Sequence, residues 1–462
     1  MTAQASAALS LDQVLASTGG RLIAHGNATH FTGVSTDTRT IPPGALFVAL
    51  KGERFDGHDF VAQAFHKGAA GIVVSRPVEA GLAGCVIQVP DTLVALGGIA
   101  KNHRSNYTLP VVAVTGSVGK TTTKDMVAGI LSQRGQVLKT QENYNNEVGV
   151  PLTALELNAS HSAAVFELAM RGPGEIAYLT RIVQPTIGVI TNIGVTHLER
   201  LGTLEAIAAA KAELLQEMGP ESVSVLNADE GISRSLQRSA KGGVVTFGFG
   251  EGADVRAVEV SGDAAAGLSF RLVTQKGDSN IALSLPGRHQ VLNALAATAA
   301  ALEAGANLDD VRAGLREVTP GKHRMHVVEA RRGFKVLDDC YNASPASMLA
   351  AFDVLADMPA KRRMAVLGEM KELGPRAPEF HREVGKAAAE KGVSFIVAVG
   401  DLAEFLREGA VGIIGEQSAL VASSLREAAD LILGQAQQGD AVLVKGSRAV
   451  GLEEVVERLI SA

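Results

Sequence analysis

The chain has 462 residues, of which 43 are Lys or Arg and 49 are Asp or Glu, so its formal net charge is −6. This balance, the absence of Trp and the lack of a basic block argue against a nucleic-acid partner. The length suffices for about three domains, and 50 Gly with 46% hydrophobic residues is typical of a compact α/β protein.

The cysteines and the apolar runs indicate the compartment. Cys85 and Cys340 lie far apart and match no metal-binding spacing, which suits free thiols in a reducing cytosol. The N-terminus has no basic segment leading into an apolar run, so no signal peptide is predicted. No apolar run reaches the roughly 18 residues of a membrane helix. We therefore expect a cytoplasmic protein without a membrane span.

Residues 1–106 are predicted to form a small α/β domain. The patterns indicate helices at Leu11–Ser17 and Phe60–Lys67 and strands at Ala45–Leu50 and Gly71–Ser75. Polar residues lie next to the strand ends, where loops often bind ligands; solvated loop charges are the alternative. These residues are Ser35, Asp37, Arg39, Lys51, Arg54, Asp56 and His58.

Residues 107–323 are predicted to form a nucleotide-binding domain around a mostly parallel sheet, because apolar β-branched runs alternate with helices. Residues 255–285 change to alternating strands with Gly-Asp turns, which indicates an antiparallel addition, and Gln290–Ala304 is a predicted helix. The predicted parallel strands are Val111–Val114, Val137–Thr140, Ala163–Leu168, Thr186–Ile193, Val223–Asn227 and Val244–Phe249.

A phosphate-binding loop is predicted between the strand Val111–Val114 and the helix Thr122–Leu131. The turn between them reads Gly-Ser-Val-Gly-Lys-Thr, and its glycines allow backbone N–H groups to point at an anion beside the helix N-terminus. Lys120 is expected to contact the terminal phosphates and Thr121 to ligate Mg²⁺. Val114 replaces the first Gly of the usual G-x-x-x-x-G-K-[ST] pattern, so this is a variant, and an ordinary Gly-rich turn is the alternative.

Glu167 and His197 follow strands whose carboxyl ends are predicted to share the edge that carries Lys120. A carboxylate and a hydroxyl suit Mg²⁺, whereas a histidine ligand is less usual for this ion. The alternatives are a strand-end capping Glu and a surface-loop His. Lys211 lies in an Ala-rich helix and, from its neighbours alone, is predicted to be a helix-surface lysine.

Four further segments carry polar residues at the ends of strands or helices. The Asn143–Pro151 loop follows the second parallel strand, and Gly287–Asn293 opens a helix. Asp338–Pro345 begins with two carboxylates, and Lys445–Arg448 offers two cations to an anion such as a substrate carboxylate. Substrate contact is one interpretation of these segments, and turn formation is the other.

Residues 324–462 repeat the α/β pattern and are predicted to form a doubly wound third domain. The Pro- and Gly-marked segment Thr319–His326 is a candidate hinge. The predicted strands are Val336–Asp338, Met364–Leu367, Ser394–Val399 and Ala441–Val444, and the predicted helices are Ala346–Ala356, Pro378–Lys391, Leu420–Gln437 and Leu452–Ile460.

Taken together and in order, the motifs resemble those of the Mur ligase family over nearly the whole chain. They include STDTRTIPPGALFVAL, KGERFDGHDF, TGSVGKTTTK, NYNNEVGVP, TNIGVTHLER, the AAAKAE helix, GRHQVLNALAA, DDCYNASPAS, VLGEMKELG with His381, and VLVKGSR. Each motif is weak alone, but their order is specific, and it is most similar to the family members that add D-alanyl-D-alanine.

The resemblance implies three domains: UDP-substrate binding at 1–106, a central P-loop ATPase at 107–323, and a Rossmann-like ligase domain at 324–462. It implies an ATP-dependent ligase that joins D-alanyl-D-alanine to UDP-N-acetylmuramoyl-tripeptide through an acyl phosphate, in peptidoglycan precursor synthesis. It also implies two Mg²⁺ ions and a monomer in the cytoplasm.

The resemblance assigns roles residue by residue, with Lys120, His197 and Lys211 as catalytic residues. Lys211 matches a lysine that is carbamylated in the family, and this overrides its prediction as a surface residue. The implied metal ligands are Thr121, Glu167 and His197. The implied ATP contacts are Gly116, Ser117, Val118, Gly119, Lys120, Thr121, Thr122, Asn293, Arg324 and Asp339. The implied substrate contacts are Ser35, Asp37, Arg39, Asp56, Asn145, Asn146, Asn342, Lys445, Ser447 and Arg448.

The chain departs from the family pattern at Ser344, where Asn is usual, and in the ELAMRGPGEI segment after Glu167; Arg324 matches the hinge arginine only approximately. Three other functions agree less well with the sequence. A regulatory P-loop NTPase would require a guanine-reading motif, and a sister ligase adding the third amino acid would require an Asp-Asn-Pro-Arg run; neither is present. A folate-type polyglutamate ligase does not normally carry the N-terminal motifs.

Overall fold

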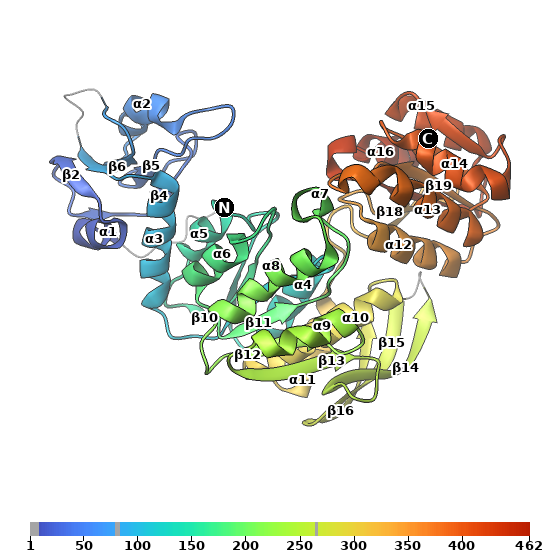
Figure 1. The fold of residues 1–462 in the computed structure, drawn as a ribbon, viewed down its shortest axis with the longest axis horizontal. Coiled ribbons are helices and arrows are strands. Elements are labelled where there is room, and N and C mark those ends of the chain that lie inside the picture. Colours follow the sequence, from blue (N-terminus) through green and yellow to red (C-terminus); the bar gives the residue numbers. More distant parts are fainter. Residues whose placement is uncertain (1–8, 79–83, 264–266) are drawn as a thin grey trace.

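The computed structural model describes residues 9–78, 84–263 and 267–462. Three main sheets follow one another along the chain, and each lies within one of the three predicted segments (Figure 1). The central sheet connects an N-terminal part on one side to a C-terminal part on the other (Figure 1). This is the predicted three-part α/β architecture; the domain limits at 106/107 and 323/324 stay predictions.

The N-terminal part contains a five-stranded sheet in the order β2-β7-β6-β5-β4, which is parallel except at the edge pair β2–β7. A separate antiparallel pair joins β1 and β3. The strands are β1 (Leu9–Ser10), β2 (Arg21–Ala24), β3 (His30–Phe31), β4 (Val34–Ser35), β5 (Leu46–Val48), β6 (Gly71–Val74) and β7 (Cys85–Gln88). The helices are α1 (Leu11–Thr18), α2 (Val61–His66) and α3 (Thr92–Ser105), with a 3₁₀ turn η1 (Gly57–Phe60).

Helix α3 ties the N-terminal part to the central one, because it packs against α1 and also against α5 and α6 (Figure 1). Asp91 caps its first turn by accepting from the N–H groups of Leu93 and Val94. Near its end, the buried Arg104 donates to the carbonyl oxygens of Val183 and Gln184 at 2.9 and 3.2 Å. This helix was not predicted from the sequence.

The central sheet has nine strands in the order β16-β15-β14-β13-β12-β11-β8-β10-β9. Pairs from β9 to β14 are parallel, and β14, β15 and β16 pair antiparallel, which confirms the predicted addition. The strands are β8 (Val111–Thr115), β9 (Gln136–Lys139), β10 (His161–Glu167), β11 (Ile187–Ile190), β12 (Val223–Asn227), β13 (Gly243–Gly248), β14 (Val255–Asp263), β15 (Gly267–Thr274) and β16 (Gly277–Leu283).

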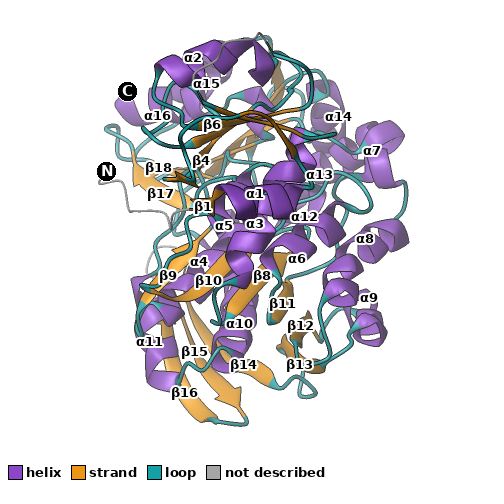
Figure 2. Ribbon diagram, turned by 90° about the vertical axis from the view of Figure 1, so that its left-hand side faces the viewer, coloured by secondary structure: helices purple, strands orange, loops and turns teal. Residues whose placement is uncertain are grey.

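Helices cover both faces of the central sheet, as the continuous apolar strands require (Figure 2). Val111 and Ala113 of β8 belong to the core beneath α3, α5, α6 and α8, whereas Val112 and Val114 belong to the core beneath α4, α10 and α11. The helices are α4 (Lys120–Leu131), α5 (Gly149–Ala154), α6 (Glu175–Val183), α7 (Leu198–Leu201), α8 (Leu204–Glu217), α9 (Gly231–Ser235), η2 (Leu236–Ser239), α10 (Arg288–Glu303) and α11 (Leu308–Glu317).

The C-terminal sheet has six strands in the order β17-β18-β22-β19-β20-β21, parallel except for the edge strand β17. Its two faces carry separate cores, which confirms the doubly wound prediction. The strands are β17 (His326–Glu329), β18 (Lys335–Asp338), β19 (Arg363–Gly368), β20 (Phe395–Val399), β21 (Ala419–Ala422) and β22 (Ala441–Lys445). The helices are α12 (Pro345–Asp357), η3 (Gly374–Arg376), α13 (Ala377–Glu390), α14 (Ala403–Ile414), α15 (Leu425–Gln435), η4 (Arg448–Val450) and α16 (Glu453–Ser461).

The predicted single helix Leu420–Gln437 is wrong. Its first residues belong to strand β21, and helix α15 begins after Ser424, whose hydroxyl accepts from the N–H of Glu427. Helix α14 was also missed. Among the helices of the described residues, none is both long and apolar enough to cross a membrane.

Candidate active site

The loop between β8 and α4 curls so tightly that two of its positions have no room for a side chain. Gly116 has φ 149° and Gly119 has φ 81°. A β-carbon on Gly116 would lie 1.9 Å from Oγ1 of Thr191, and one on Gly119 would lie 2.3 Å from Oδ1 of Asn293. The predicted strand–turn–helix is present, and the two glycines are required by its geometry.

The residues after β11 hold this loop from the side. Val118 donates its N–H to Oδ1 of Asn192 at 2.9 Å, and Thr191 donates its hydroxyl to the carbonyl of Val118 at 2.6 Å. The hydroxyl of Ser117 donates to the carbonyl of Gly194 at 2.8 Å. Among the described residues, no side chain caps the N-terminus of α4, so its first N–H groups and its positive dipole end are available to an anion.

Lys120 bends back over the loop and donates from Nζ to the carbonyl oxygens of Gly116 at 2.8 Å and Ser117 at 3.3 Å. Burial lowers the pKa of Lys120; the carboxylate of Glu167 opposes this shift and the guanidinium of Arg324 adds to it. The charges of a carboxylate and a guanidinium therefore act on the ammonium group at the predicted cradle. Arg324 arrives from the segment before the C-terminal sheet, with its guanidinium 3.9 Å above the ring of Tyr341.

Glu167 ends β10 opposite Val114 of β8. It therefore lies at the carboxyl ends of the parallel strands, where the phosphate-binding loop also lies. Asn145 donates from Nδ2 to its Oε1 at 2.7 Å, whereas Oε2 is buried and has no hydrogen-bond partner among the described residues. A buried carboxylate oxygen without a donor is costly unless a cation occupies the space beside it. Glu167 therefore fits the predicted metal-ligand role.

His197 follows β11 and begins α7 in a left-handed conformation, with φ 55°. Its Nδ1 lies 2.5 Å from Oε2 of Glu372 in the C-terminal domain, although the two groups lack the alignment of an ideal hydrogen bond. His197 holds the pKa of the Glu372 carboxyl below its usual range. With Thr121 in the first turn of α4, these residues supply the hydroxyl, carboxylate and imidazole that the predicted metal set requires.

Lys211 is buried in α8 with 2% of its surface exposed, so its prediction from neighbouring residues as a surface lysine is wrong. Burial and the nearby charge of Lys120 hold its pKa well below the usual value. Among residues 9–78, 84–263 and 267–462, no hydrogen bond or ion pair of its side chain is formed. A buried amine with a strongly lowered pKa and no hydrogen-bond partner among the described residues requires an explanation that packing does not give.

Asn293 lies on α10 and accepts from the hydroxyl of Thr123 at 3.4 Å, which places it against α4.

Asn145 and Asn146 are adjacent, but their side chains have different partners. Asn145 holds Glu167, whereas Oδ1 of Asn146 accepts from the N–H groups of Val148 and Gly149 and shapes the start of α5.

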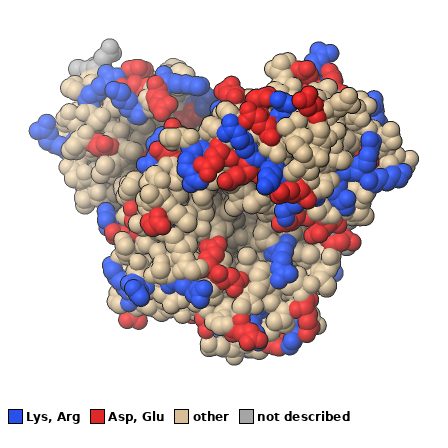
Figure 3. All heavy atoms as spheres, turned by 45° about the vertical axis from the view of Figure 1, so that its right-hand side comes forward, with Lys and Arg blue, Asp and Glu red and all other residues tan. Residues whose placement is uncertain are grey.

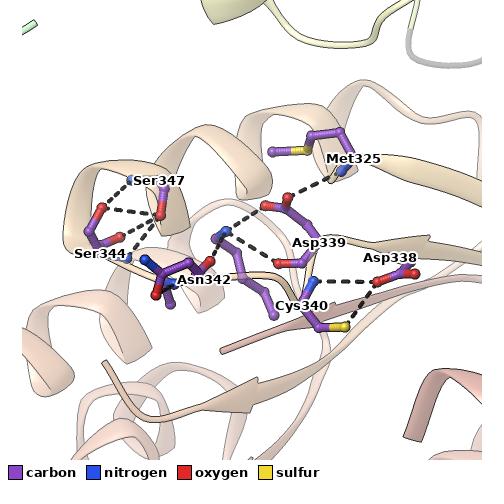
Figure 4. A network of polar contacts seen from close by, with 9 residues as sticks. Met325, Asp338, Asp339, Cys340, Asn342, Ser344 and Ser347 are labelled. Atoms are coloured by element: carbon purple, nitrogen blue, oxygen red, sulfur yellow. Dashed lines mark hydrogen bonds and ion pairs between the residues drawn. The ribbon is translucent and has the colours of Figure 1, made fainter. Parts of the chain in front are cut away.

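The C-terminal domain contributes a buried polar network (Figure 4). Nζ of Lys445 lies 2.5 Å from Oδ2 of Asp339 and donates to the carbonyl of Asn342 at 3.0 Å. Oδ1 of Asp339 accepts from the N–H of Met325 at 3.1 Å. The predicted ATP contact Asp339 and the predicted substrate contact Lys445 are thus partners of each other.

Ser447 and Arg448 differ in exposure. Ser447 is buried and joins two loops, since its N–H donates to the carbonyl of Glu369 and its hydroxyl accepts from the N–H of Lys371. Arg448 is exposed and pairs with Glu453 at 3.3 Å. Of Lys445, Ser447 and Arg448, which all lie in the described part of the chain, Arg448 is the one whose side chain is open to solvent for the predicted anion.

The predicted substrate residues of the N-terminal domain lie in that domain and make no described contact with the phosphate-binding loop. Arg39 pairs with Asp37 at 2.6 Å, and the hydrogen bond lowers the pKa of Asp37. Oδ1 of Asp56 contacts Nδ1 of His58 at 2.6 Å, and the hydroxyl of Ser35 donates to the carbonyl of Asp37. The polar groups follow the ends of parallel strands, as predicted.

Glu372, which touches a predicted metal ligand, was not among the predicted site residues, and its motif MKELG was the available signal. His289 lies in the candidate segment Gly287–Asn293, and burial lowers its pKa to about 4 beside Asp339. Basic and acidic side chains are interspersed on the face shown in Figure 3, without a large basic patch for nucleic acid.

Comparison with protein families covers most of the chain. The family descriptions that match are "Mur ligase family, catalytic domain" at residues 30–104, "Mur ligase middle domain" at 114–301 and "Mur ligase, glutamate ligase domain" at 323–448.

Relatives with a curated description and solved structures agree with this. UDP-N-acetylmuramoyl-tripeptide–D-alanyl-D-alanine ligase from Synechocystis is 44% identical, over 93% of this chain and 92% of its own, and that from Escherichia coli is 39% identical over 92% and 93%. The crystal structure of MurF from Acinetobacter baumannii has TM-score 0.92 and 35% identity, covering 99% of this chain and 100% of that chain. MurF from Thermotoga maritima in complex with ADP has TM-score 0.83 and 30% identity, covering 92% and 96%. The chain belongs to the Mur ligase family.

Proposed function

We propose that the chain is an ATP-dependent ligase that joins D-alanyl-D-alanine to UDP-N-acetylmuramoyl-tripeptide and releases ADP and phosphate. The observation that carries this proposal is the identity of 39–44% to two relatives described by that activity, over more than nine-tenths of the chain. The site geometry agrees with it, because a phosphate-binding loop, an unpaired carboxylate oxygen and a buried lysine converge between two domains.

In the first step, a terminal carboxylate oxygen of the tripeptide forms a bond to the γ-phosphorus of ATP. The bond from that phosphorus to the β–γ bridging oxygen breaks, and ADP leaves. Lys120 and the N–H groups at the start of α4 neutralise charge on the phosphates during this transfer. In the second step, the amine of D-alanyl-D-alanine attacks the activated carbonyl, phosphate leaves, and the amine proton passes to solvent.

Thr121, Glu167 and His197 are proposed to hold Mg²⁺, which when bound supplies positive charge against the transferring phosphoryl group. The donor set fits, since Oε2 of Glu167 is buried and has no donor among the described residues. Lys211 is proposed to carry a carbamate. Its lowered pKa favours the neutral amine, which adds to CO₂ with loss of one proton and becomes an anion suited to a second Mg²⁺.

Substrate binding is proposed to follow the domain order. The UDP end would contact the Ser35, Asp37, Arg39 and Asp56 group. Asn293 would contact the adenine side of ATP, and Arg324 would also contact ATP. Arg448 would contact the carboxylate of the incoming dipeptide. Movement about Thr319–His326 would bring the C-terminal domain over the acyl phosphate and exclude water from it. We also propose that the protein acts in the cytoplasm, where ATP and UDP-linked precursors are available, and that it acts as a monomer.

The proposal is tested with purified protein, Mg-ATP, UDP-N-acetylmuramoyl-tripeptide and D-alanyl-D-alanine. We expect the UDP-pentapeptide to appear in a one-to-one ratio with ADP. ADP release that is equally fast without the dipeptide, or the absence of the pentapeptide, would falsify the ligase function. Replacing D-alanyl-D-alanine by diaminopimelate or lysine with the UDP-dipeptide tests the sister activity in the same assay.

A further inference from the structure

The contact between His197 and Glu372 joins two domains at two residues of unusual backbone conformation. His197 has φ 55° and Glu372 has φ 65°. Left-handed backbone is unfavourable for a residue with a side chain, so both conformations are maintained by their surroundings. Each conformation places its side chain in the same contact, with 2.5 Å between Nδ1 and Oε2.

This contact belongs to a wider seam between the central and C-terminal domains. The N–H of Glu199 donates to the carbonyl of Glu372 at 3.1 Å. Val195 and Leu198 pack against the core of the C-terminal domain. A β-carbon on Gly374 would lie 3.0 Å from the Cα of Glu199, so the two backbones approach closely. The loop that carries His197 is therefore docked on the segment that carries Glu372.

Hydrogen bonds within the C-terminal domain fix the segment that carries Glu372. His381 is fully buried, its Nε2 accepts from the N–H of Met370 at 2.9 Å, and its Nδ1 faces the carbonyl of Ala377 at 2.6 Å. The hydroxyl of Ser447 accepts from the N–H of Lys371 at 2.9 Å. Both anchors lie within two residues of Glu372, so its backbone is preset before the domains meet.

We propose that Glu372 is a positioning residue that orients His197 for the metal when the C-terminal domain docks; this rests on the metal site of the proposed function. A carboxylate at Nδ1 keeps the proton on that nitrogen and leaves the lone pair of Nε2 free for a cation. Thr121, Glu167 and His197 all belong to the central domain. Docking of the C-terminal domain fixes the orientation of His197 and so completes the set of metal ligands. Phosphoryl transfer is thereby tied to the closed arrangement that protects the acyl phosphate.

The test measures metal binding instead of turnover. Mn²⁺ is titrated into the full-length protein with a non-hydrolysable ATP analogue, and free Mn²⁺ is followed by electron paramagnetic resonance. Outer partners of metal ligands contribute about 10- to 100-fold in affinity, so we expect Glu372→Ala to raise the Kd for Mn²⁺ by about 10-fold or more. Glu372→Gln keeps an oxygen acceptor and should recover most of the affinity.

Glu379→Ala is the matched control, because it also removes one carboxylate, here 52% exposed and paired with Arg376, beside the same segment. It should bind Mn²⁺ as the parent does. An unchanged Kd in Glu372→Ala, or an equal loss in Glu379→Ala, overturns the proposal. If Glu372→Ala does not fold, as judged by thermal unfolding, the Kd for Mn²⁺ is compared between Glu372→Gln and Glu372→Lys. Glu372→Lys should bind Mn²⁺ more weakly than Glu372→Gln, and equal Kd values overturn the proposal. A parent that binds Mn²⁺ but makes no pentapeptide refutes the proposed function alone, and a parent that binds no Mn²⁺ refutes the metal site and this proposal together.

Discussion

Oδ1 of Asn293 lies 2.3 Å from the place that a β-carbon on Gly119 would occupy. Asn293 belongs to α10 and Gly119 to the phosphate-binding loop, so the start of α4 is packed directly against the next helix of the same face. The loop is thus shaped by two requirements at one residue: a left-handed backbone, and space for a neighbouring amide.

Gly119→Ala should weaken the binding of Mg-ATP by at least about 10-fold, because Ala is strained at φ 81° and its methyl group displaces Asn293. Isothermal titration with Mg-ATP measures this loss. Gly412→Ala is the control: Gly412 lies inside α14 with open space around it, and Ala there should stabilise the fold by up to about 1 kcal/mol without changing ATP binding. Equal ATP affinity in Gly119→Ala and the parent would contradict the proposed packing role.

Lys211→Ala should lose at least about 100-fold in ligase activity, and short-chain carboxylates should restore part of it by replacing the carbamate anion. For the parent, ¹³C-bicarbonate should give a carbamate signal in the carbon NMR spectrum that is absent from Lys211→Ala. Lys124→Ala is the control for a second buried lysine, since Lys124 already donates to the carbonyl of Thr140 at 2.8 Å. Its spectrum should retain the carbamate signal, and a spectrum without such a signal in the parent would refute the modification.

The phosphate-binding loop was predictable because its determinants are local. Apolar β-branched residues, two glycines and a Lys-Thr pair follow one another within one short segment, and the structure places the strand, turn and helix there. The alternation of strands and helices predicted the sheets for the same reason. The prediction failed where helix propensity does not distinguish a helix from a strand. The Ala- and Leu-rich residues after Leu420 are compatible with a helix, but pairing with β20 makes the first of them a strand.

The burial of Lys211 and the contact of Glu372 depend on tertiary structure. An Ala-rich helix carries little information about which face is covered, so only the packing of α8 shows that Lys211 is enclosed. Glu372 reaches His197 across a domain boundary, and no spacing within either motif indicates that pairing. The family resemblance implies a role for Lys211, but it indicates none for Glu372.

Asp339→Ala should lower the free energy of unfolding of the C-terminal domain by about 3–5 kcal/mol, because it leaves Lys445 buried without its counter-charge. Urea denaturation followed by circular dichroism measures the change. Glu408→Ala breaks an exposed pair with Arg382 and should cost at most about 1 kcal/mol. The double variant Asp339→Ala/Lys445→Met removes both charges and should recover part of the loss; a loss as large as that of Asp339→Ala alone would show that the ion pair is not the cause.

His289 predicts an acid-dependent loss of stability. Burial lowers its pKa to about 4 in the folded protein, against an ordinary value of 6.5. Between these values the unfolded chain binds more protons than the folded one, so the free energy of unfolding falls as the pH drops from 6.5 towards 4. The shift corresponds to about 3 kcal/mol at most, and partial exposure of the ring reduces this to about 1–2 kcal/mol.

Urea unfolding at neutral pH and near pH 4.5 should therefore show a smaller loss of unfolding free energy in His289→Gln than in the parent. His66→Gln, at an exposed position that ends α2, should lose as much as the parent. Equal losses in the parent and His289→Gln would contradict the assignment, because the protonation of His289 would then make no difference to stability.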